Sequence, residues 1–537
     1  MSEERVTVES GDFADYGSSY FAASMVPHAG HPALNLDLDV DVCVIGGGLA
    51  GLTTAREIAR RGWSVVVLEG RRIAWGASGR NTGFVLPGYG QRLQAIISRT
   101  GVERAKILWS LAQAGLDYVR ETIAETGMPG AALTGGGWLM VSKVDRAEEV
   151  RDETAFLRTT FGADVAMWPT GKVRAHLKSP HYFQAIHFRD AFHIHPLNYA
   201  LGLAKSAEEA GVRIFERTPA LSIDPVGVRK RVVTPNARVR AGHVVLAGNV
   251  HLGALMPGVS RTLVPITTYL AATVPLGAAA AADAIAFAGS VSDTNLADNH
   301  YRLAGDRLIW SGRMTVHESS PARYARRLRR DIARIFPQLG KVDFEYAWRG
   351  TLGNAVHRMP QIGEMQPGLW VASGFGGHGL NTTAMAGNLI ARAIAEDSKT
   401  WRHFEPFELI WAGGPFGRAA AKISYLGYTV KESVAARLAR RNERKRKRKS
   451  VLDEQRAEKL WSRLQKNGSA AEESVSVAAP PPEMDAPLPP HASIPLEAEA
   501  PLPPEADAAV EAEVSAEAQG HPGTKPGRKT RRKKSPG

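Results

Sequence analysis

A glycine-rich turn between two short apolar segments constrains the fold of this chain more than any other feature. Residues 41–45 have the pattern of a buried strand, and the turn at residues 46–51 has glycines in G-x-G-x-x-G spacing. Residues 52–61 have the pattern of a helix, and residues 64–68 form a second apolar strand. A strand, a glycine turn, a helix and a second strand in this order predict a βαβ unit of a parallel sheet.

The same unit predicts a dinucleotide site. Gly46 permits a tight turn, Gly48 lets a pyrophosphate approach the backbone, and Gly51 lets the helix pack close to the sheet. Glu69 follows the second strand, where a carboxylate accepts hydrogen bonds from a ribose hydroxyl. Because an acid holds this place, a 2′-phosphate is disfavoured despite the arginines that follow. The alternative is a glycine turn without a ligand, and the motif alone does not separate FAD from NAD.

Two further segments belong to the same pattern. Residues 71–83 read RRIAWGASGRNTG directly after the second strand, and residues 369–380 read LWVASGFGGHGL. The second segment is an apolar strand that leads into a glycine turn and then a helix. The free N–H groups of such a helix start face whatever binds there. A cap without a ligand is the alternative, but it needs fewer glycines than this turn has.

These motifs resemble the D-amino-acid-oxidase-like family of FAD-dependent oxidoreductases. The subgroup that fits best is the gamma-glutamylputrescine oxidase-like amine oxidases, which share the W-G-A-S-G-R-N-x-G run and an upstream S-Y-x-A-A-S arm. Here these are residues 75–83 and 19–24, and the resemblance covers about residues 18–420. It implies an FAD site in which the start of the later helix stabilises the negative charge of the reduced flavin.

The resemblance also implies that FAD is bound without a covalent link. In relatives that link the flavin through His, that residue aligns at Gly76, and in relatives that link it through Cys, the position aligns near Trp348. Cys43 is expected in the first strand, facing the core. The expected cofactor-binding residues are Gly46, Gly48, Leu49, Ala50, Gly51, Glu69, Gly70, Arg71, Trp75, Gly76, Ala77, Ser78, Gly79, Arg80, Asn81, Gly83, Pro219, Ala220, Ala247, Gly248, Gly374, Gly376, Gly377, His378, Gly379 and Leu380.

For the substrate, the resemblance implies a small amine or amino acid that gives a hydride from its α-carbon to flavin N5 and becomes an imine. Relatives that bind a carboxylate through Lys have it where Asn381 stands, and the Lys that activates oxygen would fall near Ile309. A larger amine or polyamine conjugate is therefore favoured, with O2 as the expected acceptor. A dehydrogenase that uses a quinone or carrier, and a non-catalytic FAD-binding adaptor, are the alternatives. The candidate catalytic or pocket residues are Tyr269, Trp310, Arg313, Trp348, His357 and His378.

The predicted fold class is α/β, with a Rossmann-type FAD-binding domain and an interleaved α+β substrate domain that has a mixed or antiparallel sheet. A helical extension and a disordered tail are expected after these domains, and the oligomeric state is not predicted. The expected boundaries are 1–37 for an N-terminal arm, 38–100, 196–254 and 346–398 for the FAD-binding domain, 101–195 and 255–345 for the substrate domain, 399–467 for the basic helical extension, and 468–537 for the tail.

The strong charge of the chain is confined to its last hundred residues. The formal net charge is +13, but residues 437–449 hold nine Lys or Arg and one Glu. Residues 471–520 hold eleven acids, and the last seventeen residues hold seven Lys or Arg. Three interpretations stay open for the basic extension: a docked helix with a solvated tail, weak contact with a membrane surface, and weak contact with nucleic acid.

The remaining features are expectations about compartment and metals. The first ten residues do not resemble a signal peptide, no apolar run is long enough to span a membrane, and the chain has one cysteine. A cytoplasmic location is therefore expected. His193 and His195 lack a third ligand nearby in the sequence, so no metal site is predicted.

Overall fold

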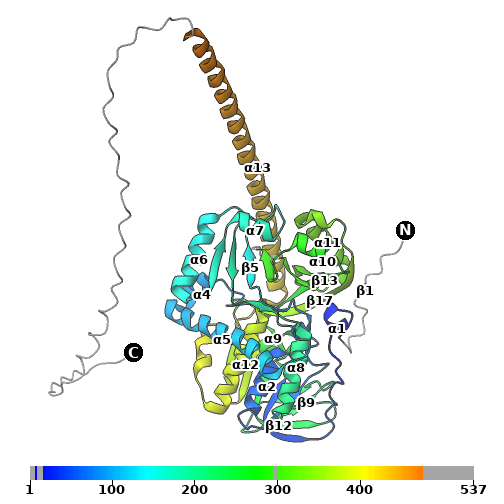
Figure 1. Cartoon of the computed structure of the whole chain (residues 1–537). Helices are drawn as coiled ribbons and strands as arrows, with labels where there is room; N and C mark the ends of the chain where they lie inside the picture. The colour runs from blue at the N-terminus through cyan, green and yellow to red at the C-terminus, as the bar shows by residue number, and fades with distance from the viewer. Residues whose placement is uncertain (1–6, 9–15, 294–298, 476–537) are drawn as a thin grey trace, which may run out of the picture. The chain divides into compact units, whose positions relative to one another are not determined.

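The computed structural model describes residues 7–8, 16–293 and 299–475. Residues up to Gln455 belong to one compact unit, and the residues from Arg456 onward belong to a second one. Figure 1 shows the first unit, with β12, β9, α2 and α8 at one end and β5, β13, β17 and α11 at the other. The described residues form two large sheets and a two-stranded one, in which β4 (Phe84–Val85) pairs with β8 (Phe192–His193).

The first sheet contains the predicted glycine motifs. Within the described residues it has eight strands, and β12, β2, β3 and β9 run parallel, as does β19 beside β12. Parallel strands that are covered on both faces have nearly continuous apolar sequences. The strands of this sheet could therefore be recognised from the sequence. The strands are β10 (Ser222–Asp224), β11 (Lys230–Val233), β12 (Arg238–Leu246), β2 (Leu38–Ile45), β3 (Val65–Leu68), β9 (Arg213–Phe215), β19 (Leu369–Ser373) and β18 (Gln361–Gln366).

Helices pack together beside the first sheet. Those next to its glycine turns are α2 (Leu49–Ala59), α3 (Ala77–Arg80), α8 (Pro196–Glu209) and α12 (Gly379–Glu396). The core between them includes Leu52, Leu197 and Leu389, all buried. His195 begins α8, because its Nδ1 accepts a hydrogen bond from the backbone N–H of Asn198 over 3.1 Å.

The second sheet has mixed pairing, as predicted. Within the described residues it has nine strands, among which β13, β16 and β17 are antiparallel neighbours, whereas β14 and β5 are parallel. In order they are β1 (Thr7–Val8), β17 (Phe344–Ala355), β13 (Leu263–Thr273), β16 (Arg307–Thr315), β15 (His300–Ala304), β14 (Ser290–Asp293), β5 (Trp138–Val141), β7 (Ala185–Phe188) and β6 (Val165–Trp168).

Further helices precede, connect or follow these strands in the chain. The α-helices are α1 (Tyr20–Ala23), α4 (Leu93–Thr100), α5 (Val102–Thr126), α6 (Ala147–Phe161), α7 (Thr170–His176), α9 (Pro257–Ser260), α10 (Ala278–Ala284), α11 (Pro321–Ile335) and α13 (Gly414–Val475). Short 3-10 helices span η1 (Asn249–Leu255), η2 (Pro337–Leu339) and η3 (Thr400–Phe404).

The architecture of the body agrees with the predicted fold class, and two boundaries differ in detail. β17 belongs to the second sheet through its pairing with β13, so residues 346–355 lie with the expected substrate domain. The last helix continues to Val475, so residues 468–475, expected in the tail, are helical. The rest of the expected tail, residues 476–537, lies outside the described residues. No helix in the described part of the chain is long and apolar enough to cross a membrane.

Candidate functional site

A cavity of about 2540 Å³ opens at the carboxyl ends of the parallel strands of the first sheet. Its lining includes Ile45 and Gly46 after β2, Glu69 after β3, and Ala247 after β12. This edge is where open α/β sheets bind ligands, because helix starts and loops converge there. Residues 376–380, more than three hundred positions later in the chain, line the same cavity.

The first glycine turn has no room for side chains. A Cβ added to Gly51 would lie 2.0 Å from the carbonyl oxygen of Gly46, so α2 packs directly on the end of β2. A Cβ on Gly48 would lie 2.9 Å from Oγ of Ser78, and this hydroxyl accepts a hydrogen bond from the N–H of Leu49 over 3.1 Å. The backbone at the start of α2 is therefore presented to the cavity, as a pyrophosphate requires.

Glu69 is held in place by the backbone beside this turn. Its Oε2 accepts from the N–H of Gly47 over 2.7 Å, and its Oε1 accepts from the N–H of Arg71 over 2.8 Å. Burial raises the pKa of Glu69, and these two donors oppose that rise. Pro219 and Ala220 line the cavity next to it. A carboxylate at the tip of β3, beside small apolar residues, fits the adenosine half of a dinucleotide.

The second glycine turn begins α12 on the other side of the cavity. Gly376 has a φ of 60°, and a Cβ there would lie 2.6 Å from Oδ1 of Asn354, so a glycine lets the turn approach β17. His378 lies directly before the helix, and its side chain is half-buried at the cavity wall. Burial, followed by the charge of His300, lowers the pKa of His378 to about 4, so its imidazole is neutral at physiological pH.

The residues present therefore fit a flavin dinucleotide. Two helix starts and one carboxylate face a single cavity. The glycines of the first turn, and Gly376 in the second, stand where a Cβ would clash. The first turn suits the phosphates, whereas the start of α12 offers N–H groups to an acceptor edge at the other end.

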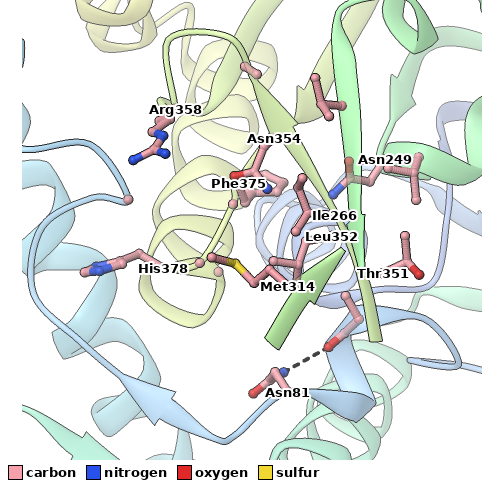
Figure 2. Close-up of a pocket in the computed structure, with 18 of the residues that line it drawn as sticks. Asn81, Asn249, Ile266, Met314, Thr351, Leu352, Asn354, Arg358, Phe375 and His378 are labelled. Carbon is pink, nitrogen blue, oxygen red and sulfur yellow. Dashed lines mark hydrogen bonds between the residues drawn. The ribbon is translucent and has the colours of Figure 1, made fainter. Parts of the chain in front are cut away.

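Most of the predicted cofactor residues line this cavity. They are Gly46, Gly48, Leu49, Ala50, Glu69, Gly70, Arg71, Trp75, Gly76, Ala77, Ser78, Asn81, Pro219, Ala220, Ala247, Gly248, Gly376, Gly377, His378, Gly379 and Leu380. Figure 2 shows Asn81 and His378 among the lining residues.

Five predicted cofactor residues lie behind the lining: Gly51, Gly79, Arg80, Gly83 and Gly374. They shape the site indirectly. The glycines at 79 and 83 would place a Cβ 2.6 Å and 2.1 Å from backbone carbonyl oxygens, so they permit close packing of the chain. The arginine is buried and donates to the carbonyl oxygens of Trp75 and Tyr16, which ties the N-terminal arm to the body. The motif residues therefore include some that support the cavity from behind as well as some that line it.

Of the six predicted catalytic residues, Arg313 and His378 line the cavity. Arg313 is tied to one carboxylate, because its Nε and Nη2 donate to the two oxygens of Asp331 over 2.7 Å and 2.6 Å. This bidentate pair fixes the arginine at the cavity wall.

The other four, Tyr269, Trp310, Trp348 and His357, do not line the cavity. The first three are buried in the core with ring stacking or hydrogen-bond partners. Tyr269 and Trp310 stack on neighbouring tyrosine rings, at centroid distances of 3.7 Å and 4.5 Å, and the indole of Trp348 donates to a backbone carbonyl oxygen over 3.0 Å. His357 makes its hydrogen bonds to backbone groups of residues 359 and 408.

The part of the cavity wall away from the two glycine turns is made largely by residues that sequence reasoning missed. Figure 2 shows Ile266, Leu352, Met314 and Phe375 close together, with Arg358 on another part of the lining and its side chain directed away from them in this view. The first two are cross-strand partners in β13 and β17. Phe375 lies inside the second glycine turn, so the glycine motif could have been used to predict it as a lining residue. The others had no such signal, because their places depend on strand register and loop conformation.

Helix α13 also lines the cavity, through Ser424, Tyr425 and Tyr428. The hydroxyl of Tyr425 accepts a hydrogen bond from the N–H of Met314 over 3.2 Å. This contact joins the C-terminal helix to β16, and it makes the helix part of the same wall.

One group of potential metal ligands occurs among the described residues, away from the cavity: His28, His31 and Glu216. The carboxylate of Glu216 already accepts from the N–H groups of His31 and Ile73 and pairs with Arg72 over 2.9 Å. We call this buried group of His31, Arg72 and Glu216 the clasp, because it joins the N-terminal arm to the body.

Comparison with known proteins agrees with the site. The profile described as FAD dependent oxidoreductase (DAO) matches residues 41–393. The chain is 31% identical over 425 residues to a probable oxidoreductase OrdL of Haemophilus influenzae, covering 78% of this chain and 97% of that protein. It is 32% identical over 396 residues to gamma-glutamylputrescine oxidoreductase of Escherichia coli, covering 73% and 92%.

Solved structures show the same fold. Glycine oxidase from Geobacillus kaustophilus matches with a TM-score of 0.59 at 20% identity, covering 70% of this chain and 99% of that one. L-amino acid deaminase from Proteus vulgaris matches with a TM-score of 0.58 at 18% identity, covering 72% and 99%. The family expected from the sequence motifs is confirmed, and the chain belongs to the FAD-dependent oxidoreductases of the DAO family, whose members act on amines and amino acids.

Proposed function

We propose that this enzyme oxidises an amine that also carries an anionic group, as gamma-glutamylputrescine does. The observation that carries the proposal is the continuity of the cavity, which reaches from both glycine turns to Arg358. The similarity to gamma-glutamylputrescine oxidoreductase supports this substrate class.

Arg358 is the proposed anchor for the anionic group. It follows β17 in a left-handed conformation with a φ of 56°, and it is exposed on the cavity wall. Its guanidinium has no carboxylate partner among the described residues, unlike that of Arg313, which Asp331 occupies. A free guanidinium binds a carboxylate well, because its N–H groups match the two oxygens.

The apolar side chains of the same cavity are the proposed place of the amine. Ile266, Leu352 and Phe375 remove water from a bound nitrogen, and loss of hydration favours its neutral form. The neutral form is needed because its lone pair assists loss of hydride from the neighbouring carbon. His378 is uncharged at neutral pH, so it adds no positive charge that would repel residual ammonium.

FAD, when bound, would take the hydride from the carbon next to the nitrogen. The amine loses that hydride and one proton and becomes an imine, which water hydrolyses to an aldehyde and ammonia when the amine is primary. We propose O2 as the final acceptor, which is reduced to hydrogen peroxide. The position where relatives have a Lys for oxygen activation falls near Ile309, which is buried in β16.

An anaerobic flavin reduction assay tests the function. Gamma-glutamylputrescine and simple amines are mixed with the flavin-loaded protein, and loss of the visible flavin absorbance is followed. We expect bleaching, with the conjugate acting at lower concentration than putrescine. If no amine bleaches the flavin, the adaptor alternative is favoured; if bleaching occurs but air yields no peroxide, a dehydrogenase with a quinone or carrier acceptor replaces the oxidase.

Substitution of Arg358 tests whether the substrate carries an anionic group, independently of whether the enzyme oxidises amines. We expect Arg358→Met to raise the KM for gamma-glutamylputrescine by about tenfold or more, since a hydrogen bond to a charged group contributes about 1.5–3 kcal/mol. The matched control is Arg402→Met, an exposed arginine in η3 outside the cavity lining. Equal KM values for the two variants would show that the substrate's anionic group does not bind at Arg358.

We further propose that FAD is bound non-covalently and that the protein acts in the cytoplasm. The single cysteine, Cys43, is fully buried in β2 and lies outside the cavity lining. Acid precipitation should therefore leave the yellow colour in the supernatant. Colour that stays in the pellet would show a covalent link, and fractionation of cells tests the location.

A further inference from the structure

The part of α13 within the first unit, residues 414–455, has one face packed against the body. Tyr425 reaches Met314, Ala436 is buried, and Glu443 pairs with Arg174 over 2.5 Å. These three positions are separated by eleven and seven residues, so they lie on one side of the helix. Because this side of the helix packs against the body, the opposite side faces away from the body.

The opposite face carries a stripe of apolar side chains. Successive members of this apolar stripe are seven, seven, four and four residues apart, and at 100° per residue they lie across the helix from Tyr425. Their exposed fractions run from 49% to 82%. The stripe consists of Phe416, Ile423, Val430, Val434 and Leu438. Exposed apolar residues in such a row normally mark an interaction site.

On the same face of α13, basic side chains follow the apolar stripe towards the C-terminal end of the helix. Arg441, Lys445 and Arg448 follow Leu438 at intervals of three, four and three residues, and all are exposed. Within the described part of the chain, none of these three has a carboxylate within ion-pair distance. The single acid among residues 437–449, Glu443, lies on the inner face. The outer face is therefore apolar first and strongly positive afterwards.

We propose that this face of α13 docks the enzyme on the surface of a membrane rich in anionic lipids. The apolar stripe enters the boundary between headgroups and acyl chains, and the basic residues meet the lipid phosphates. A second copy of the chain fits less well, because it would bring like charges together. Nucleic acid would match the charge but leave the apolar stripe exposed to water.

Vesicle co-sedimentation of the full-length, flavin-loaded protein tests the proposal. Vesicles of phosphatidylglycerol and phosphatidylcholine are compared with vesicles of phosphatidylcholine alone, at low and high salt. We expect the protein to sediment with the anionic vesicles at low salt and to remain in the supernatant with the neutral ones. The triple variant Ile423→Asp/Val430→Asp/Val434→Asp should reduce partitioning to anionic vesicles by about tenfold or more.

A control places two new aspartates elsewhere on the surface. Val226 and Val228 are 77% and 88% exposed in the turn between β10 and β11, and Val226→Asp/Val228→Asp should bind vesicles like the parent protein. The seven Lys or Arg of the last seventeen residues are present in every variant, so a difference reports on α13. Flavin absorbance of each variant shows that the body is folded.

Two results would overturn the proposal. One is recovery of the parent protein in the supernatant with anionic vesicles at low salt. The other is equal sedimentation of the stripe variant and the parent, in which case charge alone is responsible; complete competition by duplex DNA would then assign the face to nucleic acid.

Discussion

The two walls of the cavity differ in composition, because one is mainly backbone and the other is mainly side chains. The cofactor wall consists largely of backbone and small residues in two turns, with Gly48 and Gly376 standing where a Cβ would clash. The substrate wall consists of side chains such as Ile266, Met314 and Tyr425, which come from two strands and the C-terminal helix. A wall of backbone tolerates almost no substitution, whereas a wall of side chains can be altered one contact at a time. On the proposed function, the first wall binds the cofactor and substitutions in the second alter which substrate is bound.

The largest expected effect is on flavin content, and it comes from a glycine packed directly behind the cofactor wall. In Gly51→Ala the new Cβ would meet the carbonyl oxygen of Gly46 at 2.0 Å, which forces α2 away from β2. Such overpacking costs about 1–3 kcal/mol or more, so we expect the variant to purify with less than about a tenth of the parent's flavin. The control is Gly171→Ala in α7, where a Cβ meets no atom within 4 Å. Normal flavin content in Gly51→Ala would contradict the role of this glycine.

The second effect concerns the clasp behind the cofactor wall. Burial alone would raise the pKa of Glu216, but hydrogen bonds from His31 and the N–H of Ile73, together with the charge of Arg72, outweigh burial and lower it to about 2. Stability from a depressed carboxyl pKa is present above the unfolded pKa and is lost as the pH falls from about 4.5 towards 2. Because the side chain is only 1% exposed, the shift corresponds to about 3 kcal/mol.

Urea unfolding of the parent and of Glu216→Gln at pH 7 and pH 3 measures this effect. We expect the variant to be less stable by about 3 kcal/mol at pH 7, and the difference to shrink at pH 3. A difference that does not change with pH would mean that the charge of Glu216 contributes nothing.

The smallest expected effect is on the substrate wall. Tyr425→Phe removes the hydroxyl that accepts from the N–H of Met314, which costs about 1 kcal/mol. We expect the KM for gamma-glutamylputrescine to rise by about fivefold, with flavin content unchanged. Loss of flavin in this variant would show that the two walls are not independent.

The same difference explains what could be predicted from the sequence. Gly46, Gly48 and Glu69 lie within one short βαβ unit, so local spacing was enough to place them. Phe375 could have been added, since it lies inside the second turn. Backbone sites leave a pattern in the sequence because few residue types can occupy them.

The substrate wall could not be predicted in this way. Tyr269 and Trp348 were expected at the pocket, but the face that each side chain takes depends on the register between β13 and β17, and a shift of one residue reverses it. Tyr425 meets Met314 across 111 residues, and no local pattern in the sequence indicates such a contact. Arg358 owes its place to a left-handed backbone conformation that arginine rarely adopts.

The distance along the chain between the two glycine turns has a consequence for synthesis. The ribosome makes β2 early, but the start of α12 emerges more than three hundred residues afterwards. The nascent chain must therefore hold its first parallel strands together without the cofactor for most of translation, a period in which exposed strand edges favour aggregation. A site that uses both turns can therefore hold the cofactor only after residue 379 has been made, so FAD can stabilise the finished body but contributes through this site only late in synthesis.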